Sequence, residues 1–260
     1  FYLHNPWFHA KIALVTFRTG DGGPPRRMAL IGTGNMSAVT ARSYVDLWVA
    51  TTRPECREDV AAVFQLLSGR SKQREFGCLL VAPVNLRQRF LELIDTESAN
   101  AAAGRPAGIR AMMNGLTDPA IIEALNRASQ AGVRVDLAVR GISLLRPGVP
   151  RISENVRVVS LAGRLLQHAR IFHFTNAGND LYLVGSADWR PRNLDHRVEV
   201  VAPVTGTSMF AEAPYSNVTI RTDVPRRAFS YLLEHREEFP GVVVEKRFLR
   251  PSRTRAVIRL

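Results

Sequence analysis

The sequence predicts an α/β fold in which a mixed sheet is flanked by helices, and three observations lead to this prediction. With 260 residues, 46% of them hydrophobic, the chain can bury a large core as one or two domains. Short aliphatic runs alternate with amphipathic stretches of helical period, and turns rich in glycine and proline separate them. No apolar run approaches the roughly 20 residues that a membrane-spanning helix needs, so we expect no transmembrane segment.

Residues 1–75 are expected to form the first of two similar units. The aliphatic runs Lys11–Phe17 and Met28–Ile31 predict strands on either side of a loop rich in glycine and proline. Val45–Ala50 predicts a third strand, and Pro54 then begins a helix. Four apolar side chains of this helix fall on one face: Val60, Val63, Phe64 and Leu67.

The polar segment Ser68–Glu75 is the expected boundary, and residues 76–205 are expected to form the second unit. Cys78–Ala82 predicts a buried strand, a long helix begins at Leu86, and Ile109–Met113 predicts another strand.

The next helix has clear signals at both ends. Asp118 caps its start, Pro119 occupies its first turn and Gly132 stops it before the strand Val133–Val139. From Thr205 onward the apolar periodicity weakens, so residues 206–260 are expected to be a divergent C-terminal tail.

The charge balance and the two cysteines limit the classes of function. Lys+Arg 35 against Asp+Glu 23 leaves a formal charge of +12, which fits either a polyanionic partner or a solvated basic surface. Cys56 and Cys78 are too few for a disulfide framework, so we expect buried thiols in a reducing cytoplasm. The chain begins at Phe1 without signal-peptide features, and we expect it to be a fragment of a longer protein.

A degenerate duplication of polar residues is the most informative feature. His9-Ala10-Lys11 opens one apolar strand, and His168-Ala169-Arg170 opens another. Alternate side chains of a strand share a face, so each histidine lies beside its following cation. A turn of small residues comes next in each copy, Ile31–Asn35 in the first and Val184–Asp188 in the second.

Each copy then places a carboxylate at the same spacing. Asp46 follows Asn35 by eleven positions, and Glu199 follows Asp188 by eleven. Each is preceded two positions earlier by a side chain that can bind phosphate, Tyr44 and Arg197.

This set of residues suits phosphoryl transfer. A histidine that attacks phosphorus needs a neutral ring nitrogen, and a carboxylate that accepts the other ring N–H fixes that tautomer, a role we expect of Asp46 and Glu199. Phosphoryl oxygens carry charge through the transition state, so we expect an electrostatic clamp. Its candidate side chains are Lys11, Arg170 and Arg197.

Nine short stretches along the chain form one further pattern. They are His9–Lys11, Ile31–Asn35, Thr40–Arg42 with Tyr44, Ala131–Val133, Val139–Ile142, Leu145–Val149, Ser153–Asn155, Ser186–Trp189 and Pro191–Asp195. In order and spacing, over about residues 9 to 204, they resemble the C-terminal part of bacterial polyphosphate kinase.

The resemblance implies tandem phospholipase D-like half-domains, each a mixed sheet flanked by helices, with the first half incomplete. It implies reversible transfer of the ATP γ-phosphate to polyphosphate, with Mg²⁺ and through a phosphohistidine. His9 would be phosphorylated, His168 would be the second catalytic histidine, and three side chains would contact the nucleotide phosphates: Tyr44, Arg140 and Arg197. We therefore expect ATP to phosphorylate His9 and the substitution Asp46→Asn to weaken the adduct.

The resemblance also carries expectations about metal, assembly and location. Metal ligands are expected in an N-terminal segment outside this chain rather than within it. The partners would be ATP, ADP and polyphosphate, with no specific nucleic acid and a homo-oligomeric full-length protein. A cytoplasmic location is expected, with room for peripheral association with the membrane.

Two other functions remain open. A phospholipase D-like phosphodiesterase would use the same paired histidines, but such enzymes usually carry Asp seven positions after each histidine. Thr16 and Thr175 stand there instead, and Arg170 replaces a lysine, so this alternative ranks lower. The other alternative is a polyanion-binding fragment without catalytic activity.

Overall fold

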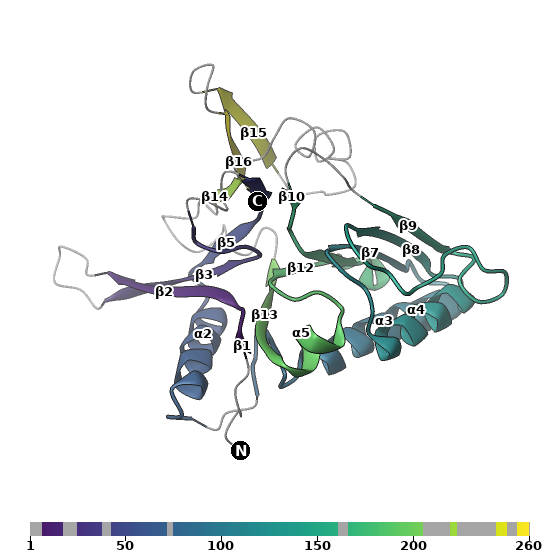
Figure 1. Cartoon of the computed structure of the whole chain (residues 1–260), viewed down its shortest axis with the longest axis horizontal. Helices are drawn as coiled ribbons and strands as arrows, with labels where there is room; N and C mark the ends of the chain where they lie inside the picture. Colours follow the sequence, from purple (N-terminus) through teal and green to yellow (C-terminus); the bar gives the residue numbers. More distant parts are fainter. Residues whose placement is uncertain are drawn as a thin grey trace.

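The structure of the 260-residue chain is a computed structural model. It describes residues 7–17, 25–37, 43–71, 75–160 and 166–204, together with the strands at 219–222, 243–248 and 254–259. The predicted α/β class is confirmed, because a large mixed sheet carries helices on one face (Figure 1).

In the first part of the chain, the described residues include a three-stranded antiparallel sheet and the helix α2 (Pro54–Leu67) (Figure 1). β2 (Lys11–Phe17) pairs with β3 (Arg26–Gly32), β3 pairs with β5 (Trp48–Thr51), and α2 packs against β2 and β3. The helix buries Val60 and Val63 as predicted, whereas Phe64 is 41% exposed.

The predicted strand Val45–Ala50 is interrupted. β4 (Tyr44–Val45) ends before Asp46, and β5 begins only after Leu47. The break allows Asp46 to leave the sheet and meet a side chain from the second unit.

The second part builds most of an eight-stranded mixed sheet with the order β1-β13-β12-β11-β7-β8-β9, and β6 also pairs with β13. These strands are β1 (Trp7–Phe8), β6 (Leu80–Ala82), β7 (Gly108–Met113), β8 (Arg134–Val139), β9 (Val156–Val159), β11 (Ile171–Phe174), β12 (Leu181–Gly185) and β13 (Arg197–Val204). The shorter elements are β10 (Leu166–Gln167), the 3-10 helix η1 (Asn176–Gly178) and α5 (Pro191–Asp195).

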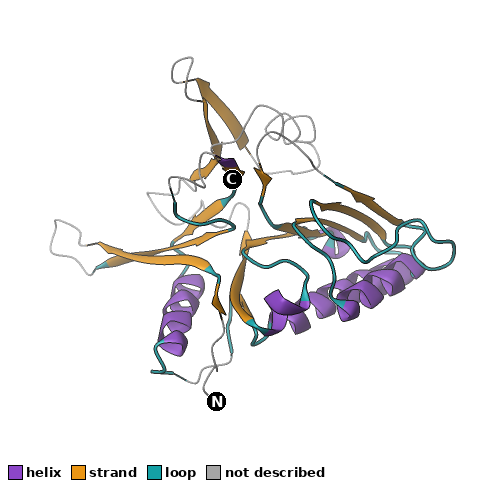
Figure 2. Cartoon of the chain, in the orientation of Figure 1, coloured by secondary structure: helices purple, strands orange, loops and turns teal. Residues whose placement is uncertain are grey.

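Two long helices, α3 (Leu86–Ala102) and α4 (Pro119–Gln130), run side by side along this sheet (Figure 2). The sequence signals at the start of α4 work as expected, because the Asp118 side chain accepts a hydrogen bond from the Ile121 amide and Pro119 stands in the first turn. Its apolar residues recur at helical spacing and are buried: Ile121, Ala124, Leu125 and Ala128.

A second, smaller core joins the two parts of the chain. It packs Ile31 of β3 and Val60 of α2 against Leu79, just before β6, and against Val200 of β13. The first sheet is therefore held directly against the strand that carries Glu199, which positions the site described below.

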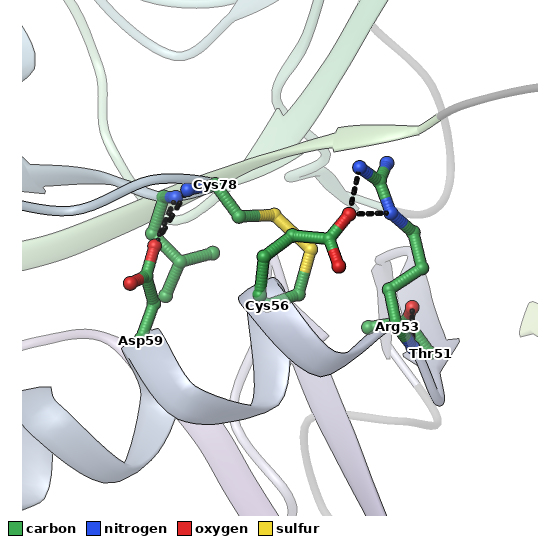
Figure 3. The surroundings of a disulfide bond; sticks show 7 residues. Thr51, Arg53, Cys56, Asp59 and Cys78 are labelled. Carbon is green, nitrogen blue, oxygen red and sulfur yellow. Dashed lines mark hydrogen bonds and ion pairs between the residues drawn. A yellow bond between two sulfur atoms is a disulfide. The ribbon is translucent and has the colours of Figure 1, made fainter.

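Cys56 and Cys78 form a disulfide, so the expectation of free thiols is wrong (Figure 3). Their Cα atoms lie 5.1 Å apart, and the bond joins the first turn of α2 to the residue two before β6. Sequence spacing could not reveal this pairing, because it depends on how α2 packs against the second unit. Both side chains are buried, as expected. Asp59 of α2 also links the helix to the segment before β6, because its side chain accepts hydrogen bonds from the Cys78 and Leu79 amides at 2.7 and 2.9 Å.

The expected tail contains three strands that form an antiparallel sheet in the order β14-β16-β15. They are β14 (Thr219–Thr222), β15 (Val243–Phe248) and β16 (Thr254–Arg259). The motif Thr40–Arg42 lies outside the described residues. Within the described part of the chain, no helix has the length and apolar character to cross a membrane.

Candidate active site

Two short parallel strand pairs bring the duplicated motifs together. β1 pairs with β13, so that Trp7 and Phe8 lie opposite Arg197 and Val198. β10 pairs with β4 in the same register, with Leu166 and Gln167 opposite Tyr44 and Val45. Each histidine motif therefore runs beside the carboxylate motif of the other copy.

Backbone hydrogen bonds repeat the same crossing. The His9 amide donates to the Val198 carbonyl at 3.0 Å, and the His168 amide donates to the Val45 carbonyl at 3.0 Å. In both cases the acceptor is the residue just before the carboxylate.

The histidine–carboxylate pairs are crossed in the same way. His9 Nδ1 lies 2.9 Å from Glu199 Oε2, and His168 Nδ1 lies 2.8 Å from Asp46 Oδ1. Asp46 therefore contacts His168 rather than His9, so the expected effect of Asp46→Asn on the His9 adduct has to be reassigned to Glu199. The reason is the swapped strand pairing, which the equal spacing within each copy does not reveal.

The electrostatics of the His168 pair favour an imidazole braced by a carboxylate. Burial lowers the pKa of His168, and the Arg170 charge lowers it further. The hydrogen bond that Asp46 accepts from the ring raises this pKa but does not outweigh the two. Burial opposes ionisation of Asp46, but its hydrogen bonds with His168 and Thr33 outweigh this and lower its pKa. The ring is thus kept neutral near neutral pH, with Nδ1 directed at an ionised acceptor.

Glycine in the first small-residue turn makes room for this arrangement. A Cβ built on Gly34 would lie 1.9 Å from Asp46 Oδ2, and one on Gly32 would lie 2.5 Å from the Trp48 ring. These two glycines therefore allow close packing of the carboxylate and the ring.

Lys11 lies beside His9 and interacts electrostatically with both carboxylates, Glu199 and Asp46. Its ammonium donates to the His9 carbonyl, and its side chain is buried. Burial lowers the pKa of Lys11 to about 8, helped by Arg170 and Arg197 and opposed by Glu199 and Asp46. A cation beside His9 that interacts electrostatically with both carboxylates suits the charge of a phosphoryl group.

Like Lys11, Arg170 donates to the carbonyl of its own histidine, at 2.6 Å from Nη1 to the His168 oxygen, but it also makes further contacts. It is 3% exposed, and its Nε lies 3.2 Å from Asp188 Oδ1 in a buried ion pair. Its Nη1 also donates to the Thr33 carbonyl at 3.1 Å and lies 3.1 Å from the His168 ring nitrogens. Arg170 therefore supports His168 and ties the two units together.

Two of the other predicted phosphate ligands, Tyr44 and Arg197, lie beside these histidine–carboxylate pairs, whereas no contact among the described residues joins Arg140 to either histidine. The Tyr44 and His168 rings have centroids 5.1 Å apart, and Arg197 Nη1 lies 4.0 Å from Glu199 Oε1. Arg140, at the end of β8, is half-buried, and its Nε has no hydrogen-bond partner among the described residues.

Sequence reasoning missed three side chains that contact the carboxylates: Thr33, Ser186 and Asn193. Thr33 and Ser186 occupy the same position in the two small-residue turns, and this repetition was the available signal. The position in the first copy that corresponds to Asn193 is Thr40, which lies outside the described residues, so the duplication did not point to Asn193.

Comparison with known families decides the family. The family model for polyphosphate kinase C-terminal domain 1 matches residues 3–73, and the model for polyphosphate kinase C-terminal domain 2 matches residues 79–222. The chain belongs to the polyphosphate kinase family.

Individual polyphosphate kinases agree with this assignment. The chain is 48% identical over 196 residues to the polyphosphate kinase of Thermosynechococcus vestitus, covering 75% of this chain and 26% of the relative. It is 45% identical over 215 residues to that of Pseudomonas aeruginosa, covering 83% of this chain and 31% of the relative. The crystal structure of polyphosphate kinase from Porphyromonas gingivalis matches with a TM-score of 0.74 and 36% identity, covering 90% of this chain and 34% of that one.

The chain therefore spans about a third or less of the polyphosphate kinases it matches. A protein site for Mg²⁺ would need several oxygen or nitrogen ligands close together. In the described ranges, no group of three or more His, Cys, Asp or Glu side chains could hold a metal ion. These residues do not supply a metal site, so the steps proposed below do not depend on one.

Proposed function

We propose that this chain is the catalytic region of a polyphosphate kinase, which transfers the γ-phosphoryl group of ATP reversibly to polyphosphate through a phosphohistidine at His9. The observation that carries the proposal is the two crossed pairs, His9–Glu199 and His168–Asp46, with the Lys11 ammonium on the His9 carbonyl. Membership of the family supports the substrates, ATP and polyphosphate.

In the first half-reaction His9 is the nucleophile. Glu199 accepts a hydrogen bond from Nδ1–H, which keeps the proton on Nδ1 and the lone pair on Nε2, and Nε2 attacks the γ-phosphorus. The N–P bond forms as the bond from phosphorus to the bridging oxygen breaks, and the electron pair leaves with ADP. His168 holds the departing oxygen.

In the second half-reaction the terminal oxygen of a polyphosphate chain attacks the same phosphorus. The new O–P bond forms as the N–P bond breaks, and the electron pair returns to Nε2 of His9. Lys11, Arg140 and Arg197 stabilise charge on the phosphoryl oxygens in both directions. Tyr44 contacts the nucleotide phosphates in this proposal.

Mg²⁺ would accompany ATP in this reaction and neutralise phosphate charge. ATP as the phosphoryl donor fits a cytoplasmic location, which we propose as well; the Cys56–Cys78 disulfide counts against it, since such bonds are rare in a reducing compartment. Homo-oligomeric assembly of the full-length protein stays a prediction.

Transfer of label from ATP tests the proposal. The chain is incubated with γ-labelled ATP, Mg²⁺ and a polyphosphate primer, and ADP and labelled polyphosphate are measured. We expect turnover that is lost in His9→Ala and His168→Ala. A chain that retains polyphosphate but transfers no label would contradict catalysis and leave a binding fragment. Hydrolysis of a phosphodiester by the same histidines would favour the phospholipase D-like alternative.

A further inference from the structure

The two small-residue turns place a hydroxyl group on each catalytic carboxylate. The Thr33 hydroxyl donates to Asp46 Oδ1 at 2.7 Å, and the Ser186 hydroxyl donates to Glu199 Oε2. Each hydroxyl stands thirteen positions before its carboxylate. Asp46 Oδ1 also faces the His168 ring, and His9 Nδ1 lies 2.9 Å from both Glu199 oxygens, Oε2 included. In each copy the hydroxyl therefore contacts a carboxylate oxygen that also faces the histidine ring.

Backbone amides fix the direction of both hydroxyl protons. The Leu47 amide donates to Thr33 Oγ1 at 2.9 Å, and the Val200 amide donates to Ser186 Oγ at 3.2 Å. A hydroxyl that accepts from an amide directs its own proton elsewhere, and here the proton points to the carboxylate. That carboxylate oxygen then acts as an acceptor from the hydroxyl and from the histidine ring. The histidine must therefore carry its proton on Nδ1, which leaves the lone pair on Nε2.

We propose that Thr33 and Ser186 are positioning residues that hold the tautomers of the two catalytic histidines, each acting on the histidine of the opposite unit. Thr33 controls His168 through Asp46, and Ser186 controls His9 through Glu199. The chemical role of these tautomers rests on the function proposed above. The assignment of the tautomers rests on the hydrogen bonds alone.

The two hydroxyls are not equally important. Glu199 is fully buried and also accepts a hydrogen bond from Asn193 Nδ2 at 2.6 Å, on its other oxygen Oε1. Asn193 lies on α5, and Asp46 has no such additional amide donor among the described residues. Loss of the Ser186 hydroxyl leaves Glu199 anchored by Asn193, whereas loss of the Thr33 hydroxyl leaves Asp46 with His168 as its one side-chain donor among the residues that the structure describes. We therefore expect Thr33 to have the larger effect.

Nitrogen-15 NMR of the histidine rings tests the proposal without any assay of catalysis. At neutral pH the wild-type chain should show His9 and His168 as the Nδ1–H tautomer. Thr33→Val, which keeps the shape and removes the donor, should move His168 toward a mixture of tautomers and leave His9 unchanged. Ser186→Ala should do the reverse. The crossing discriminates positioning from local structural damage, because damage would act first on the unit that carries the substitution.

Two controls separate loss of a hydrogen bond from loss of packing. Thr33→Ser restores the hydroxyl and should restore the His168 spectrum. Ser153 is buried like Ser186, but its hydroxyl donates to the Arg146 carbonyl far from the histidines in sequence. Ser153→Ala should leave both histidine spectra unchanged. If Thr33→Val changes His9, or if neither substitution changes a tautomer in a folded chain, the proposal is overturned.

Kinetics form the second arm of the test. Thr33→Val should lower kcat about tenfold, the lower end expected for one hydrogen bond to a charged group, with little change in KM for ATP. It should also shift the pH profile of kcat, because an unanchored Asp46 alters the proton affinity of His168. An unchanged pH profile would argue against positioning. If the wild-type chain transfers no phosphoryl group, the proposed function fails while the NMR arm still decides the tautomers.

Discussion

Reduction of the Cys56–Cys78 disulfide should destabilise the protein by a predictable amount. The bond closes a loop with a sequence separation of 22 residues. In the chain-entropy model, closing a loop of that length removes about 3 kcal/mol of entropy from the unfolded state at 25 °C. The native contacts should survive reduction, because Asp59 still holds the Cys78 and Leu79 amides (Figure 3). The effect should therefore come chiefly from the unfolded chain.

Urea unfolding with and without a thiol reductant measures this contribution. The free energy of unfolding of the wild-type chain should fall by about 3 kcal/mol in reductant. The double variant Cys56→Ala/Cys78→Ala should behave like the reduced wild type and should not respond to reductant. Thiol titration of the chain unfolded without reductant should find no free thiol at either position. Two reactive thiols, or an unfolding midpoint that ignores reductant, would refute the reasoning.

Three further predictions follow from the site. Glu199→Gln should slow phosphorylation of His9 by about a hundredfold or more, because the nucleophile loses the carboxylate that orients it. Asp46→Asn should act through His168 instead. Rapid-quench kinetics of His9 phosphorylation distinguish the effects of the two variants. Lys11 has a pKa of about 8, so its ammonium loses its proton as the pH rises through 8; kcat/KM should fall above that pH, and the fall should be absent in Lys11→Arg, which stays charged. Asp188→Asn should cost about 3–5 kcal/mol in urea unfolding, because it leaves the buried Arg170 charge unpaired; a loss below 1 kcal/mol would contradict the assigned ion pair.

Local sequence signals predicted many of the elements well. Lys11–Phe17 is a strand with the predicted bounds, and the helix that begins after Asp118 uses the predicted cap and ends before Gly132. These elements are determined by residues close together in the chain, whose hydrophobic period and capping chemistry can be read directly. The prediction failed at Val45–Ala50, where the strand is broken so that Asp46 can reach His168.

The pairing of the site residues could not be predicted in the same way. Sequence spacing placed Asp46 with His9, since both belong to one copy. The structure exchanges the partners, because β1 lies along β13 and β10 lies along β4. A duplicated sequence is equally compatible with pairs within copies and between copies. Only the packing of the two units distinguishes them.

Two further results depended on packing. Lys11 and Arg170 are equivalent in sequence and both donate to the carbonyl of their own histidine, but Arg170 also forms a buried ion pair with Asp188. Cys56 and Cys78 lie on different units, and their proximity follows from the small core between α2 and β6. Such long-range contacts leave no local pattern in the sequence.

The central claim is that His9, oriented by a carboxylate from the other unit, receives the phosphoryl group. The most direct measurement is to locate the bond by mass spectrometry of peptides from the chain after brief reaction with ATP and Mg²⁺, under alkaline conditions that preserve phosphohistidine. The account predicts one phosphorylated peptide, modified at His9, with its yield strongly reduced in Glu199→Gln. Modification at His168 instead, or an unchanged yield at His9 in Glu199→Gln, would contradict it.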